Sequence, residues 1–168
     1  MKKFWQGWQT VPKIKFKLDV ASINQALAEL EAYTDKVQKA AAKTVELAAE
    51  MGTEQAQSIA SYMNIYDTGA LVNGIMAVVS GEKGAVLSTA PHSAFCEFGT
   101  GVRGEDKPHP EPGLAGWKYD VNQHGEMGWW YFDGEWHWTA GMPSRPYMYN
   151  TALWLRQHLP AIAKEALK

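Results

Sequence analysis

Three histidines and two aspartates lie close together in the second half of the sequence, and side chains of these types could hold a metal ion. They are His109, Asp120, His124, Asp133 and His137. A zinc site uses ligand pairs at short fixed spacings, and no pair here follows a zinc-finger or His-x-x-x-His spacing. Cys96 is the single cysteine, so a thiolate pair is excluded. The pattern does not predict a metal site, and we expect no cofactor.

Phosphate binding and nucleophilic catalysis are equally unsupported. The glycine-bounded segment Gly81–Gly84 could be a phosphate loop, but no Gly-Lys-Ser/Thr string follows it and no long helix is expected there. A hairpin turn is the better interpretation. No Ser/His/Asp order can be assigned, and no carboxylate pair stands out. We therefore expect that the protein is not an enzyme.

Length, composition and charge favour one soluble domain. The chain has 168 residues, 46% of them hydrophobic, as is typical of a globular protein. The formal net charge of −2 gives no electrostatic footprint of a nucleic-acid binder. A lone cysteine fits a reducing cytoplasm. The basic start has no apolar run behind it, and no stretch of about 18 apolar residues occurs, so we expect neither a secretory signal nor a membrane span.

The first part of the chain predicts a strand and a long helix. Lys13–Val20 alternates polar and apolar residues, which predicts a half-buried strand. Its lysines fit the protected edge of a sheet, with a DNA contact as the alternative. From Ser22, a good N-cap, apolar residues recur at helical spacing to about Met63. That length favours a break near Tyr33–Asp35, and the stretch lacks the sustained leucine heptad of a coiled coil.

Shorter elements follow. A turn, in which Asp67 or Thr68 satisfies the first amides, should open a helical piece at 70–75. The remaining expected elements are strands at 75–80 and 85–89, a short segment at 93–98 that Gly99 ends, and a final helix at 147–168. Pro146 suits the first turn of that helix, and Pro160 should kink or divide it.

Between these elements lies a proline-rich loop followed by a cluster of tryptophans. Gly101–Pro112 should be extended or mobile, because three alternating prolines block helix and ladder. Gly116–Asp120 could form a strand. Asp133-Gly134 favours a two-residue turn that pairs Phe132 with Glu135. On that register one face carries an aromatic ladder of Trp129, Tyr131, Trp136 and Trp138.

Together these elements predict an α+β fold. A mainly antiparallel sheet is packed by a long N-terminal helix, whole or broken, and by a C-terminal helix, with an inserted Trp-rich β-hairpin. We expect a single domain over residues 1–168, within which residues 102–141 form the loop and hairpin insertion.

Three short motifs occur in a fixed order along the chain. They are Asp67-Thr68-Gly69-Ala70-Leu71, Phe95-Cys96-Glu97-Phe98-Gly99-Thr100-Gly101 and Met142-Pro143-Ser144-Arg145-Pro146-Tyr147. This set resembles the tail-completion family of long-tailed DNA bacteriophages, the neck proteins that join the capsid's portal assembly to the tail tube. The family pattern is a Thr-Gly-Leu turn, a β-hairpin, an "EFGTG" segment and an "MP-x-RP-aromatic" start of a final helix. The resemblance runs from Lys13 to the C-terminus.

The resemblance implies a structural virion protein of a phage or prophage, made in the host bacterial cytoplasm. It would form a homo-oligomeric ring, a hexamer by preference, that contacts tail-tube and head-completion proteins. DNA would pass through without specific binding, and no membrane is involved. The turn and assembly residues so implied are Asp67, Thr68, Gly69, Glu97, Phe98, Gly99, Thr100, Gly101, Pro143, Arg145 and Pro146. The aromatic ladder of the hairpin supplies candidate interface residues.

The hairpin leaves a second function open. Its Gly-Trp-Trp-Tyr-Phe-Asp-Gly-x-Trp string also resembles the aromatic repeats of cell-wall-binding modules, which stack on choline or sugar rings. Those solenoids need about three repeats or more, which this chain lacks. One backbone expectation is independent of function: Gly99 or Gly101 should have a positive φ, because a helical piece must reverse there.

Overall fold

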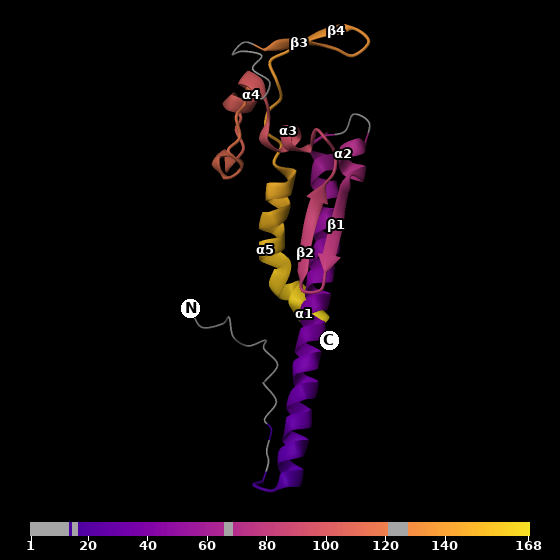
Figure 1. Cartoon of the computed structure of the whole chain (residues 1–168). Helices are drawn as coiled ribbons and strands as arrows, with labels where there is room; N and C mark the ends of the chain where they lie inside the picture. Colours follow the sequence, from indigo (N-terminus) through magenta and orange to yellow (C-terminus); the bar gives the residue numbers. More distant parts are fainter. Residues whose placement is uncertain (1–13, 15–16, 66–68, 121–127) are drawn as a thin grey trace. The chain divides into compact units, whose positions relative to one another are not determined.

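The structure is a computed structural model, and it describes residues 14, 17–65, 69–120 and 128–168. It confirms the predicted α+β class, with a long N-terminal helix, a C-terminal helix and two antiparallel strand pairs (Figure 1). The chain divides into two compact units, residues 1–40 and 41–168. The elements are α1 (Val20–Tyr62), α2 (Ala70–Asn73), β1 (Ile75–Ser80), β2 (Lys83–Ser88), α3 (Ser93–Phe98), α4 (Gly101–Asp106), the 3-10 turn η1 (Pro112–Ala115), β3 (Trp129–Phe132), β4 (Trp136–Thr139) and α5 (Tyr147–Ala166).

The start of α1 corrects two expectations. Asp19, not Ser22, caps the helix, since its Oδ1 accepts the Ser22 amide at 2.9 Å. Val20 is helical, and Leu18 is 95% exposed, so the predicted strand does not continue to Val20. Lys13, Lys15 and Phe16 of that strand lie outside the described residues.

The break expected near Tyr33–Asp35 is also wrong, because α1 is continuous. The Thr34 hydroxyl donates to the Leu30 carbonyl at 2.9 Å, which satisfies that side chain inside the helix rather than as a cap. The helix contains no proline, and its first glycine is Gly52. Length alone was therefore a poor reason to divide it.

The first hairpin packs one face on α1. β1 is confirmed as predicted, and β2 begins two residues earlier than expected, at Lys83. A Cβ at Gly84 would lie 2.8 Å from Val45, and the Gln57 amide donates to the Ile75 carbonyl at 3.2 Å. The strands therefore lie closely against the helix.

The buried core lies where α1, α2, β1, α3 and α5 meet. Its members are Ala56, Ala60, Ile65, Leu71, Ile75, Ala90, Cys96 and Tyr147. A Cβ at Gly52 would lie 2.9 Å from both Leu155 and Val86, so α5 and β2 approach α1 closely at this position. The C-terminal helix therefore packs beside the sheet, as the sequence predicted.

The segment after Gly99 is more regular than expected. Gly101–Asp106 forms α4 rather than extended loop, because the three prolines all come after it, at positions 108, 110 and 112. The helix ends at Asp106, and its C-cap Lys107 is the residue whose conformation Pro108 restricts. Gly116–Asp120 is irregular rather than a third strand.

The tryptophan-rich hairpin forms, but its register differs by one residue from the prediction. Phe132 pairs with Trp136 instead of Glu135, so the turn has three residues with Gly134 at a φ of 81°. A one-residue shift exchanges the faces of a strand. The predicted ladder of Trp129, Tyr131, Trp136 and Trp138 is therefore split between both faces. The aromatic face observed consists of Trp130, Phe132, Trp136 and Trp138.

Helix α5 begins at Tyr147, with Pro146 in the N-cap position just before the first turn. It runs through Pro160 without being divided. Tyr147, Thr151 and Ile162 form its buried stripe. Within the described residues, none of the helices combines the length and apolar character that crossing a bilayer requires.

Candidate assembly site

The "EFGTG" segment makes a sharp reversal between α3 and α4. Gly99 has a φ of 82° and Gly101 a φ of 60°, which confirms the expected positive φ. A Cβ at Gly99 would lie 2.7 Å from the Ser144 amide nitrogen, and one at Gly101 would lie 2.7 Å from the Ala140 carbonyl oxygen. Glycine is thus required here both by the backbone conformation and by the close approach of residues 140–144.

This reversal binds the "MPSRP" segment through backbone bonds. Thr100 and Met142 form an isolated antiparallel bridge, in which each amide donates to the other residue's carbonyl with nitrogen-to-oxygen distances of 2.9 and 3.0 Å. The Arg145 amide donates to the Cys96 carbonyl at 2.9 Å, and the Ser144 hydroxyl donates to the Glu97 carbonyl at 2.6 Å. Two of the three motifs therefore form one unit, which we call the α3–α5 junction (residues 96–101 and 142–149).

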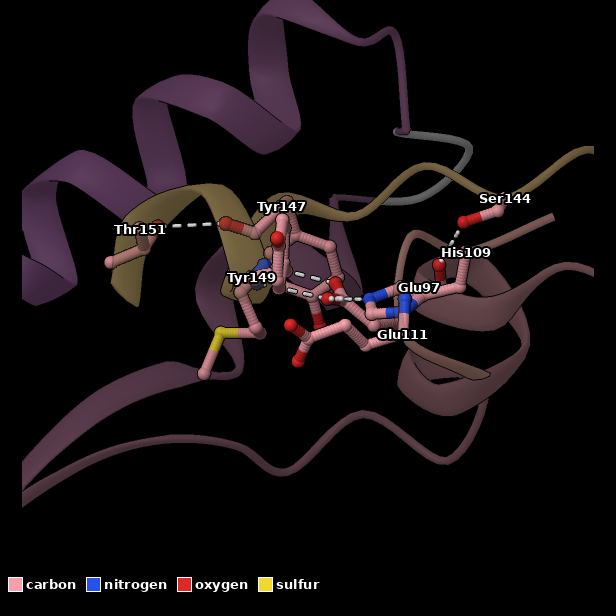
Figure 2. A network of polar contacts seen from close by, with 8 residues as sticks. Glu97, His109, Glu111, Ser144, Tyr147, Tyr149 and Thr151 are labelled. Carbon is pink, nitrogen blue, oxygen red and sulfur yellow. Dashed lines mark hydrogen bonds and ion pairs between the residues drawn. The ribbon is translucent and has the colours of Figure 1, made fainter. Parts of the chain in front are cut away.

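The Glu97 side chain caps helix α5 (Figure 2). Its Oε2 accepts the Met148 amide and its Oε1 accepts the Tyr149 amide, each at 2.9 Å. These are amides of the helix's first turn, and Pro146 at the N-cap offers no side-chain acceptor. A carboxylate is also favoured by the positive end of the helix dipole. The buried Glu97 carboxylate is therefore stabilised by α5, the helix that it caps.

His109 supplies a third donor to Glu97, at 3.2 Å from Nε2 to Oε1. The Glu111 amide donates to His109 Nδ1 at 2.9 Å, so Nδ1 acts as the acceptor and Nε2 carries the proton. The imidazole is buried and lies against Phe98 and Tyr149, with ring centroids 4.6 and 5.3 Å away. This ring orders the proline-rich segment around it. The sequence interpretation missed this role because it considered His109 only as a metal ligand.

Phe98 of the junction packs against Trp117, which comes from a later segment of the chain. Their rings stack with centroids 5.1 Å apart, and Phe95 lies 5.9 Å from the same indole. The Trp117 Nε1–H donates to the Gly99 carbonyl at 2.9 Å. An indole far along the chain thus fixes the glycine turn, and nothing in the local pattern pointed to this pairing.

Cys96 and Tyr147 are two further titratable residues of the junction, and both are buried. Burial raises the pKa of the Cys96 thiol, and it likewise raises the pKa of the Tyr147 phenol. Cys96 is 4% exposed and belongs to the core. A protonated, covered thiol packs as a small apolar group rather than acting as a nucleophile.

The structure brings together eight of the eleven turn and assembly residues named from the sequence: Glu97, Phe98, Gly99, Thr100, Gly101, Pro143, Arg145 and Pro146. Asp67 and Thr68 lie outside the described residues. Gly69 is the N-cap of α2 with a φ of 77°, and it has no side-chain cap. The link from this turn to the junction is Leu71, which is 1% exposed and shares the core with Cys96 and Tyr147.

The β3–β4 hairpin is fixed at its base, and its aromatic side chains beyond the base are exposed. The Arg103 amide donates to the Ala140 carbonyl at 3.1 Å, and a Cβ at Gly101 would lie 2.9 Å from the Trp129 ring. Beyond this base, the observed aromatic face is between 51% and 68% exposed. Its rings meet edge to face in two cross-strand pairs, Trp130 with Trp138 and Phe132 with Trp136.

Within the described ranges, no group of three or more His, Cys, Asp or Glu side chains is placed to hold a metal ion. The Glu97 carboxylate and the His109 imidazole each accept backbone amides, and they are hydrogen-bonded to each other. Comparison with protein-family models, curated proteins and solved structures finds no match to this chain.

Proposed function

We propose that this chain is a structural protein of the neck of a long-tailed phage or prophage, which completes the tail and joins it to the head as a homo-oligomeric ring. The proposal rests on the resemblance of the three ordered motifs. The packing of two of them into one junction supports it, because a shared sequence set is best explained by a shared structural unit.

The observation that carries an assembly role is the amount of apolar surface left uncovered. Among the residues that the structure describes, the largest fully buried side chains are Tyr147, Leu71 and Thr151. By contrast, the outer face of β1 and β2 exposes Met76, Val78 and Leu87, and the second hairpin exposes its aromatic face. Contiguous apolar patches of this kind mark interaction surfaces.

A further uncovered surface is a groove of about 380 Å³ between α1, β2 and α5. Its walls are mainly aliphatic, with Val45, Ala48, Val86, Leu155 and Leu159 among them. Surfaces on separate elements suit a ring, in which each copy contacts neighbours on both sides. The net charge of −2 would also let DNA pass without adhering.

The proposal is tested by mass measurements on the protein co-expressed with the tail-tube and head-completion proteins of the same phage or prophage. We expect a complex that is lost in the Trp130→Ser/Trp136→Ser variant. The control variant is Tyr131→Ser/His137→Ser, which alters the opposite face of the same hairpin and should retain the complex. Failure of the unmodified chain to bind either neighbour would contradict the neck assignment.

A wall-binding module is the second candidate, and the exposure of the aromatic face favours it. Exposed tryptophans stack on sugar rings and bind quaternary ammonium groups. Titration with choline and peptidoglycan fragments, followed by tryptophan fluorescence, separates the two functions. Saturation at millimolar or lower concentration, abolished by Trp130→Ser/Trp136→Ser, would establish ligand binding; an unchanged signal would remove this candidate.

A further inference from the structure

The N-terminal part of α1 carries an exposed apolar stripe at coiled-coil spacing, although leucine occupies only positions 27 and 30 of it and the stripe is not the sustained leucine heptad whose absence from this helix is noted above. Val20, Ile23, Leu27, Leu30 and Val37 follow one another at intervals of three and four residues, with Thr34 completing the repeat. In a heptad, Val20, Leu27 and Thr34 occupy a positions, and the others occupy d positions. The five apolar side chains are between 39% and 76% exposed.

The opposite face of this segment is polar, and two of its side chains form a hydrogen bond with each other. Gln25 donates to Glu29 at 3.1 Å, one turn apart, and Lys36 and Lys39 lie on the same side of the repeat. These residues occupy c and f positions, which face water in a coiled coil. The segment is therefore amphipathic, with a narrow apolar seam that fits another helix better than a sheet or a globular core.

The seam can be covered without leaving a polar group unpaired. Thr34 is its polar member, and the Thr34 hydroxyl already donates to the Leu30 carbonyl at 2.9 Å. Covering it therefore removes no water-bound donor that would need a new partner. The seam extends over roughly 27 Å of helix, at 1.5 Å per residue.

The flanking residues favour a second copy of the same segment. The e and g positions beside the seam are Asn24, Ala26, Glu31, Tyr33, Gln38 and Ala40. Glu31 is the single charged residue among them, so two identical seams meet without a row of like charges. Residues 20–40 carry Glu29, Glu31 and Asp35 against Lys36 and Lys39, which is close to neutral. A helix made to bind a strongly charged partner would be expected to show one dominant sign.

We propose that the segment Val20–Val37 is a self-association surface, which forms a coiled coil with the same segment of a second copy of this chain. Most of the stability of a helix in a protein comes from the packing of its apolar face, so the contact would also stabilise this part of α1. The inference is independent of the neck assignment, because it concerns the isolated protein and the seam alone.

Sedimentation equilibrium of the full chain over a wide concentration range tests the proposal. The seam variant is Leu27→Lys/Leu30→Lys, and the matched control is Gln25→Lys/Ala32→Lys at f positions on the opposite face. Lysine is a good helix former, so both variants keep the helix propensity. We expect the unmodified chain and the control to associate, and the seam variant to associate more weakly by about tenfold or more.

Each other outcome overturns the proposal. A monomer at every concentration means that the seam is covered within its own chain or by a different protein. Association that persists in the seam variant means that another surface joins the copies, and the neck assignment would be untouched. The hairpin variant Trp130→Ser/Trp136→Ser should still self-associate through α1. If this variant loses association although its seam is intact, the self-association proposed for Val20–Val37 is also contradicted.

Discussion

Glu97 joins parts of the chain that are distant in sequence. Its carboxylate accepts amides 51 and 52 positions later in the chain, and the His109 donor comes from a third segment. Hydrogen bonds to a charged acceptor are stronger than neutral ones, and a buried donor that loses its partner is costly. This one side chain therefore adds to the backbone bonds between the two motifs and brings in the His109 segment.

Replacing Glu97 with alanine should destabilise the protein by about 2–4 kcal/mol, because it leaves the amides of Met148 and Tyr149 and the His109 ring without their acceptor. Denaturant unfolding followed by circular dichroism measures the change. Glu105→Ala on the exposed side of α4 is the control and should change stability little. Equal stability of both variants would show that Glu97 does not hold the junction.

Alanine at Gly99 should cost more than alanine at Gly134. The two glycines have φ values of 82° and 81°, but a Cβ at Gly99 meets the Ser144 nitrogen at 2.7 Å, whereas a Cβ at Gly134 meets nothing within 4 Å. We expect a loss of about 1 kcal/mol at Gly134 from conformation alone and at least about 2 kcal/mol at Gly99. Unfolding curves of both variants give the comparison, and similar losses would refute the close approach of the two motifs.

At the scale of elements, the second hairpin shows how far turn chemistry can be read from sequence. Asp133-Gly134 predicts a turn, and a turn is present, but Glu135 joins it and makes a three-residue connection. Both loop lengths accept a glycine with positive φ, so the sequence does not decide between them. The choice determines which aromatic side chains share a face, and this is why the predicted ladder was wrong.

Elements defined by local chemistry were predictable, and contacts between distant segments were not. The helical segment ended by Gly99 and the strand at Ile75–Ser80 follow from periodicity and glycine placement. By contrast, the cap of α5 depends on which distant acceptor reaches the first amides of that helix. For α5 that acceptor is Glu97, which no local pattern connects to the helix.

Proline inside α5 gives an element-scale prediction. Pro160 is exposed and cannot donate to the preceding turn, so alanine at this position restores a helical hydrogen bond. Pro160→Ala should raise stability by about 1–3 kcal/mol in thermal or denaturant unfolding. Ala152→Ser, at an exposed position of the same helix, is the control for surface substitution. A loss of stability would mean that Pro160 instead shapes the helix for the packing of Ile162.

At the scale of the whole molecule, the buried core is small and apolar side chains remain exposed on α1, on the β1–β2 pair and on the second hairpin. A protein that acts within an assembly can leave such surfaces for its neighbours to cover, and aromatic residues are enriched in the centres of interfaces. Thr100 and Arg103 form backbone hydrogen bonds with Met142 and Ala140, the residues that follow β4, and so attach the base of the aromatic hairpin to the junction and to α4.

Electron microscopy of particles from a lysogen in which this gene is disrupted tests the neck assignment most directly. We predict filled heads and separate tails, with joined virions restored when the unmodified gene is supplied from a plasmid. The Gly99→Val variant supplied in the same way should fail to restore joining, because it disrupts the junction. Intact, joined virions in the absence of the gene would contradict the assignment.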